Sequence, residues 1–170
     1  MRQSYVTPLL PNVKIGNVLG LLDVLYFSYN RYTDVYRLAE DYDFEIDEIL
    51  NELRAAELLG FVRVEGGDIM LTDLGEKVVK EKRRRREILR ERLIKIEPFK
   101  TAVELLKDKG EFTFEELVTT LRRKGFLETE GEEELKELNL TLIEWGVYSR
   151  LFDYSGEEGK FHTPSPKNLA

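Results

Sequence analysis

The sequence contains no cysteine and a single histidine, His162, among its 170 residues. Without cysteine, disulfide bridges, cysteine-based zinc sites and thiol nucleophiles are excluded. One histidine cannot form a multi-histidine metal site, and no Ser-His-Asp arrangement is recognisable around it. We expect His162 to lie on a surface hairpin and the chain to be no enzyme, with no metal and no cofactor. An enzyme with an unrecognised carboxylate site is a third alternative.

Long apolar runs are also missing, since no segment approaches the roughly 20 residues needed to cross a bilayer. The N-terminus lacks the charged, apolar and small-residue order of a signal peptide. These two absences predict a cytoplasmic protein that does not insert into a membrane. Glutamine is scarce as well, with Gln3 alone, and its scarcity together with the lack of cysteine is typical of heat-adapted proteins.

The chain does contain enough apolar sequence for a core, since 42% of its residues are hydrophobic. Its length suits one ordinary domain or two small ones. Charged residues make up 35%, which is above the quarter usual for soluble domains. The net charge of −7 argues against a protein whose whole surface binds phosphate groups.

The most informative stretch of the first half combines a helix end, a hairpin and a helix start. A helical period ends at Gly60, as in a helix closed by a left-handed glycine. Two β-prone runs follow, joined by Gly66-Gly67, a pair that tight hairpin turns favour. Thr72 or Asp73 then supplies an oxygen that caps a new helix. The runs are residues 61–65 and 68–72. This order predicts a winged helix-turn-helix.

The first predicted helix covers residues 13–29. Its apolar residues lie on most of its circumference, so we expect it to be buried on several sides. Gly16 and Gly20 are four residues apart on one face. This spacing favours a closely packed neighbour over two glycines that are merely tolerated.

The remaining helices of the first half follow from capping and periodicity. Thr33 is expected to cap a short helix, and residues 46–53 place apolar side chains on one face of a third helix. After the hairpin, residues 74–97 predict one long helix, ended by Pro98. This helix would bridge the two halves of the chain and could mediate a homodimer.

The second half repeats the order of the first. Thr113 and Glu116 form a capping box that opens a second helix. The pattern around Gly146 matches the pattern around Gly60, 86 residues earlier, so we expect it to end a third helix and start a strand. The wing loop would be residues 155–159 and the return strand residues 160–162. One matching segment and a similar helix order are the evidence for duplication.

The predicted fold is therefore mainly α with small β-wings, of the α+β class, with tandem winged helix-turn-helix domains joined by a long helix. The predicted organisation is an N-terminal arm at 1–11, a first domain with the long helix at 12–97, a second winged-helix-like domain at 98–165 and a C-terminal tail at 166–170.

The third helix of each half is acidic. Residues 43–60 carry a net charge of −5 and residues 128–144 a net charge of −6. In a winged helix that binds DNA, this helix enters the major groove between rows of phosphates. Both helices would repel DNA, which favours a non-catalytic regulatory or protein-interaction module.

Residues 77–95 have the opposite charge, a net +7. The alternative function is therefore a winged-helix DNA-binding transcriptional regulator that uses this basic helix. Its nucleic-acid-binding residues would be Lys82, Arg83, Arg84, Arg85, Arg86 and Arg90. The segment lacks the aromatic residues on which bases stack. We therefore prefer a solvated linker helix whose charge complements the acidic third helices.

Several segments resemble the C-terminal AAA-associated domain. They are residues 18–22, 35–39, 55–61, 71–72 with 75, and 141–154, and together they span residues 12–155. The last segment is the most specific, because tryptophan and glycine lie inside a long apolar pattern.

This family accompanies the ATP-binding cassettes of nitrate/sulfonate/taurine-type ABC transporters and occurs in some prokaryotes as a free-standing protein. The resemblance implies a free-standing accessory domain without the ATPase and without a catalytic signature. Its implied partner is an ABC-type ATPase or a second copy of the chain.

Overall fold

The computed structural model describes residues 9–128 and 131–166. Within this part the fold is mainly helical with two small antiparallel sheets, so the predicted α+β class is confirmed at that level. The chain divides into two compact units, one from Pro11 to Leu89 and the other from Arg90 onward together with the segment that ends at Leu10. Residues 1–8 of the predicted arm and 167–170 of the predicted tail lie outside the described residues.

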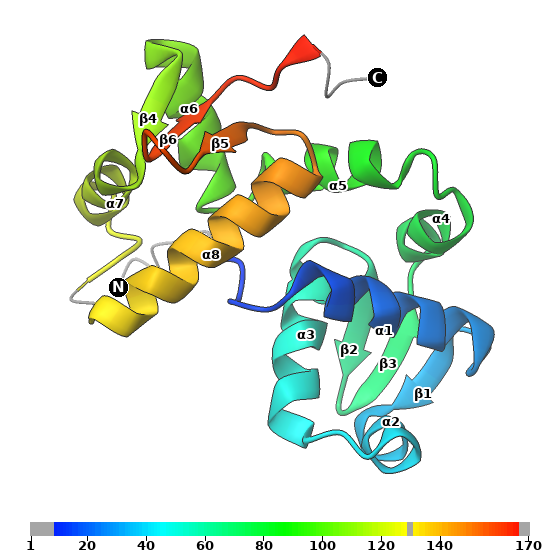
Figure 1. Ribbon diagram of the computed structural model, residues 1–170. Coiled ribbons are helices and arrows are strands. Elements are labelled where there is room, and N and C mark those ends of the chain that lie inside the picture. The colour runs from blue at the N-terminus through cyan, green and yellow to red at the C-terminus, as the bar shows by residue number, and fades with distance from the viewer. Residues whose placement is uncertain (1–8, 129–130, 167–170) are drawn as a thin grey trace, which may run out of the picture. The chain divides into compact units, whose positions relative to one another are not determined.

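Figure 1 shows the order of the helices and strands. The first unit contains α1 (Ile15–Phe27), β1 (Tyr32–Asp34), α2 (Val35–Tyr42), α3 (Ile46–Leu58), β2 (Val62–Glu65), β3 (Asp68–Leu71) and α4 (Asp73–Lys80). Helix α5 (Arg85–Leu93) spans the division at Leu89. The second unit continues with α6 (Phe99–Lys109), β4 (Glu111–Thr113), α7 (Phe114–Arg123), α8 (Glu132–Tyr148), β5 (Asp153–Ser155) and β6 (Lys160–His162).

Both units follow the order helix, strand, helix, helix, strand, strand, and both place the last strand in the centre of the sheet. The sheet orders are β1-β3-β2 and β4-β6-β5. Ile69 on β3 pairs with a residue of each neighbouring strand, and Phe161 on β6 does the same. Both central side chains are buried, so each sheet packs one face against its own helices.

The first strand of each unit was not predicted. Each is only three residues long and ends on a residue that caps the next helix. In the first unit the expected cap, Thr33, is wrong, because Thr33 is buried in β1 and Asp34 accepts the hydrogen bond from the Arg37 amide at 2.9 Å. Helix-capping residues in the sequence therefore concealed a strand whose pairing partner is distant along the chain.

The first hairpin lies where it was predicted. Gly66 and Gly67 have φ angles of 56° and 93°, which a type I′ turn requires at both central positions. Thr72 provides the expected cap, accepting the Gly75 amide at 3.0 Å. In the second hairpin the return strand is Lys160–His162, as predicted.

The end of the third helix differs from the prediction in the second unit. Helix α8 continues past Gly146 to Tyr148, and its hairpin begins only at β5. The residue that corresponds to Gly60 is Arg150, because both have positive φ angles, 84° and 63°. The offset between the units at this corner is therefore 90 residues rather than 86.

The hydrogen bonds at the two corners agree with this offset. The Phe61 amide bonds the Ala56 carbonyl at 2.8 Å, and the Leu151 amide bonds the Gly146 carbonyl at 2.9 Å. Such bonds close a helix in the Schellman motif. Gly146 is needed for a different reason, because a Cβ there would overlap the buried ring of Phe152.

The predicted long helix over 74–97 is wrong. Helix α4 ends at Lys80, a turn follows, and α5 runs only from Arg85 to Leu93. Residues 80–87 contain no apolar side chain, so a continuous helix would have no face to bury there. The break allows Val78 and Val79 to be buried together at the end of α4.

Replacement of Gly146 by alanine should lower the free energy of unfolding by about 1–3 kcal/mol, because Phe152 is enclosed by Phe112 and Phe161 and cannot move away. Gly20→Ala is the matched control, since nothing lies within 4 Å of a Cβ at this helical position. It should stabilise the protein by about 0.5–1 kcal/mol. Urea unfolding of both variants measures the difference, and equal stabilities would contradict the overlap at Gly146.

Candidate interaction surfaces

The outer face of α3 is acidic, as the sequence predicts. Asp47, Glu48 and Glu57 are exposed, and Arg54 is the only basic residue of the helix. The opposite face packs Ile49 and other apolar residues into the core. The carboxylates of α3 therefore face solvent rather than the interior of the unit.

Helix α8 has the same character. Its exposed acidic residues are Glu132, Glu133, Glu134, Glu137 and Glu144. Lys136 is the one basic side chain of the helix. Leu140 is 59% exposed between these carboxylates, so the surface of α8 combines negative charge with an apolar side chain.

The six basic residues predicted for nucleic-acid binding do not share one helical face. The exposed members are Lys82, Arg83, Arg84 and Arg86, and the first three lie in the turn between α4 and α5. Arg90 is half-buried and belongs to the second unit. Arg84 lies 3.5 Å from the Glu81 carboxylate and is therefore partly neutralised.

Arg85 points into the first unit. Its side chain is 15% exposed and its Nε donates a hydrogen bond to the Val78 carbonyl at 2.9 Å. Its Nη2 lies 3.8 Å from Asp23 Oδ1 on α1. Arg85 therefore joins the end of α4 to α1 and is not available to a phosphate.

A groove of about 310 Å³ lies between α1, α2 and α3. Gly16 and Gly20 line one side, and nothing described lies within 4 Å of a Cβ at either position. The closely packed neighbour expected at these glycines is therefore wrong for the described part of the chain. Leu38 and Ile49 form the buried floor.

The opposite side of this groove carries two carboxylates. Glu48 and Glu52 are four residues apart on α3, so they are neighbours on its surface. Burial raises the pKa of the Glu52 carboxyl, and the charge of Glu48 raises that pKa further. Sequence analysis did not connect these residues to the α1 glycines, because only the fold brings them to one groove.

Phe44 also lines the groove and contacts a small cluster of aromatic rings. It is 49% exposed and stacks on Tyr42 with ring centres 5.8 Å apart. Tyr42 in turn meets the edge of Tyr29, whose hydroxyl donates to Asp41 at 2.6 Å. Burial raises the pKa of Tyr29 to about 12, and the hydrogen bond to Asp41 acts in the same direction. Phe44 is therefore an exposed ring on a fixed support.

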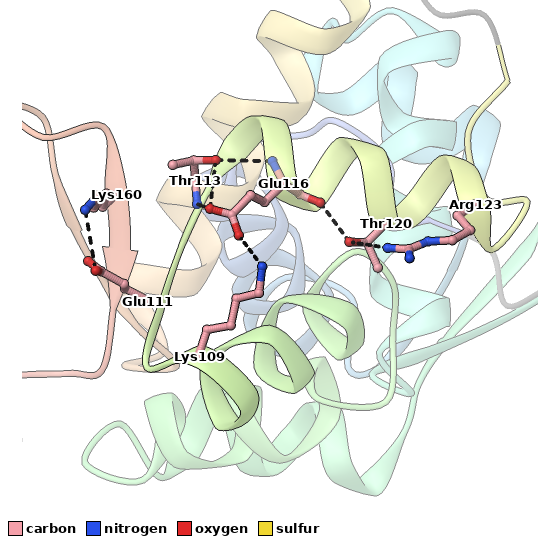
Figure 2. A network of polar contacts seen from close by, with 7 residues as sticks. All are labelled: Lys109, Glu111, Thr113, Glu116, Thr120, Arg123 and Lys160. Atoms are coloured by element: carbon pink, nitrogen blue, oxygen red, sulfur yellow. Dashed lines mark hydrogen bonds and ion pairs between the residues drawn. The ribbon is translucent and has the colours of Figure 1, made fainter.

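A network of polar contacts surrounds the start of α7 in the second unit (Figure 2). Glu116 accepts the Thr113 amide at 3.4 Å and its own amide donates to Thr113 Oγ1 at 3.2 Å, which confirms the predicted capping box. Lys109 donates to Glu116 at 2.8 Å, and this bond lowers the pKa of the Glu116 carboxyl below its ordinary value. Lys160 similarly approaches Glu111 across β6 and β4 at 3.4 Å. These charges stabilise the unit itself.

In residues 9–128 and 131–166 no three His, Asp or Glu side chains are placed to hold a metal ion. Over the same residues, no helix is long and apolar enough to span a bilayer. His162 is half-buried on β6, and its Nδ1 lies 3.0 Å from the Thr163 carbonyl oxygen.

A family model for the C-terminal AAA-associated domain matches residues 36–155 of the chain. The match begins in α2 and ends with β5, so it includes the third helix of both units. None of the curated proteins and none of the solved structures compared with the chain matches it significantly.

Arg85→Ala should lower the free energy of unfolding by about 1–3 kcal/mol, because it removes a partly buried hydrogen bond and leaves Asp23 without this partner. Arg83→Ala, at an exposed position of the same run, should change it by less than about 0.5 kcal/mol. Chemical denaturation distinguishes the two. An Arg85→Ala variant as stable as the wild type would contradict the structural role given to these contacts.

Glu116→Gln should reduce stability at neutral pH by about 0.5 kcal/mol, because the ion pair with Lys109 is 39% exposed on the glutamate side and is screened by water. The lowered pKa of Glu116 means that its contribution is present above the ordinary glutamate pKa and is lost as the pH falls through the lowered value. Unfolding curves of the variant and the wild type should therefore converge in acid. Glu115→Gln, in the same helical turn, is the control, and an equal effect there would contradict the assignment to Lys109.

Proposed function

Since the chain belongs to the C-terminal AAA-associated domain family, we propose that it is a non-catalytic accessory module that acts by binding a protein partner. The family relates the chain to accessory domains of ABC transporter ATPases. An ABC-type ATPase is therefore the proposed partner, and regulation of that ATPase is the proposed role. The family supports a non-catalytic role, because its domain is an accessory one rather than a catalytic one.

The proposed architecture is a tandem of winged helices. The order of elements in both units and the central position of β3 and β6 support it. In this interpretation α3 and α8 are the third helices, and the β2–β3 and β5–β6 hairpins are the wings. The proposed domains are residues 12–97 and 98–165, and contact between two copies of the chain is the proposed route to a homodimer.

The observation that carries the function is the charge of α3. A third helix that reads DNA lies among phosphates and requires basic or neutral side chains. Here the exposed charged side chains at the start of α3 are Asp47 and Glu48, and both would be repelled. A winged helix whose third helix cannot approach DNA can still use the surface of this helix to recognise a protein.

A DNA-binding transcriptional regulator is the alternative function. It is favoured by the exposed Lys82 and Arg83 in the turn after α4. It is weakened by Arg85 and Arg84, whose side chains are engaged within the first unit. The basic segment would therefore offer fewer phosphate contacts than its sequence suggests.

The proposed partner can be tested by capture. The full chain, immobilised and cross-linked in a lysate of its source cells, should retain an ABC-type ATPase identified by mass spectrometry. Light scattering of the purified chain and of the mixture with that ATPase gives the stoichiometry. A chain that remains a monomer and captures no protein would refute the proposed function.

The alternative can be tested by titrating labelled duplex DNA at increasing salt. We expect no binding tighter than about 1 μM near physiological salt, because dissociation constants of about 1–100 μM are typical of non-specific DNA binding. Lys82→Ala with Arg83→Ala is the informative variant. Tight binding with a steep negative salt slope that this variant reduces would establish the regulator in place of the accessory module.

A further inference from the structure

The groove between α1 and α3 is concave, partly apolar and bordered by unbalanced charge. Its volume of about 310 Å³ is at the lower end of the range for ligand pockets and suits a few side chains of a docked segment. Of the residues that the structure describes, Glu48 and Glu52 are the only charged ones that line it. Among the described residues no ion pair connects either carboxylate to a basic side chain.

The two carboxylates have an unfavourable arrangement in the isolated chain. Like charges four residues apart on a helix repel each other. Burial adds to this, since it raises the pKa of Glu52 by disfavouring the charged form. A partner that brings a positive charge to this side of the groove would relieve both effects, which is the electrostatic complementarity typical of protein interfaces.

The glycine side of the groove admits a close approach. Gly16 and Gly20 are exposed and follow one another by four residues on α1, so no side chain separates a partner from the helix backbone there. Their spacing matches the ridge of a helix, whose side chains also repeat at four-residue intervals. The exposed ring of Phe44, which stacks on Tyr42, also lines the groove, and aromatic side chains of this kind are enriched at protein interfaces.

These features select one kind of occupant. The groove is lined by side chains of helices and of Phe44, with no sheet edge to which an extended peptide could add a strand. Nucleic acid and anionic membrane surfaces carry the same sign of charge as Glu48 and Glu52 and would be repelled. The remaining candidate is a helix with an aliphatic stripe and basic residues beside it, because it matches both the shape and the charge of the groove.

We propose that the groove between α1 and α3 binds a basic amphipathic helix of the protein partner. Its aliphatic side chains would lie over Gly16, Gly20 and the floor of the groove, and its lysine or arginine residues would face Glu48 and Glu52. This inference rests on the proposed function, since it specifies where an accessory module holds its partner and what the partner presents.

The probe is a fluorescently labelled helical peptide of leucine and lysine in an amphipathic pattern, with a leucine and glutamate peptide of the same pattern as the control. Binding to the full chain is followed by fluorescence anisotropy. The test variants are Gly20→Leu, which fills the groove at an open helical position, and Glu48→Gln with Glu52→Gln, which removes its charge. Thermal unfolding of each variant confirms that it is folded.

Each test variant has a matched control in the second unit. Thr119→Leu adds the same side chain at an exposed position of α7, and Glu132→Gln with Glu133→Gln removes the same charge from α8. We expect each groove variant to weaken binding of the lysine peptide at least about tenfold and each control to change it less than about twofold. The amide signals of Gly16 and Gly20 should shift in heteronuclear NMR spectra when the peptide is added.

Three results would overturn the proposal: no binding of the lysine peptide, equal binding of the glutamate peptide, or equal weakening by the control variants, which would indicate general attraction to an acidic protein. Failure here is distinct from failure of the proposed function. If the Gly20→Leu variant captures the ATPase as well as the wild type does, the groove is not the docking site although the accessory role stands. If the wild type captures nothing but the peptide binds the groove, the accessory role fails alone.

Discussion

The rest of the structure depends on one pairing in each unit, that of the last strand with the first. These pairs are β3 with β1 and β6 with β4. They connect Thr33 to Ile69 and Phe112 to Phe161, which are far apart along the chain. The hydrogen bonds of this ladder satisfy backbone groups that would be costly to bury unpaired. Because Ile69 and Phe161 are fully buried, the ladder also sets which face of each sheet meets the helices.

The helix-to-hairpin corners follow from this pairing. The chain must leave the third helix and enter the sheet within a few residues, so a left-handed residue closes the helix in both units. Glycine fills this role at residue 60 and arginine fills it at residue 150. In the second unit the glycine is used four residues earlier, where Phe152 presses against the helix. The same corner is thus built from different residue types.

The distribution of charge separates the surfaces by their role. Arg84 and Arg85 make contacts within the first unit, whereas Glu48 and Glu52 of α3 line an open groove. The family relates the chain to accessory domains of ABC transporter ATPases, and the role proposed for it requires a surface that binds a partner. The acidic side of α3, the exposed glycines of α1 and Phe44 line the groove that is proposed as this surface.

The hairpin turn at Gly66-Gly67, the caps at Thr72 and Thr113 and the acidic third helices could be predicted from sequence, because each depends on residues close together along the chain. Local conformational preference and local charge are sufficient to specify them. The family resemblance also followed from the sequence, and the family match confirms it.

Only the tertiary structure decided the features that depend on distant residues. The first strands of both units have no local signal, since their stability comes from a partner strand elsewhere. The break between α4 and α5 reflects the lack of apolar side chains in residues 80–87. Gly16, Phe44 and Glu52 are separated along the sequence, and the packing of α1 against α3 brings them to one groove. The burial of a side chain and its proximity to distant residues are properties of the folded chain, so a short segment of sequence cannot specify them.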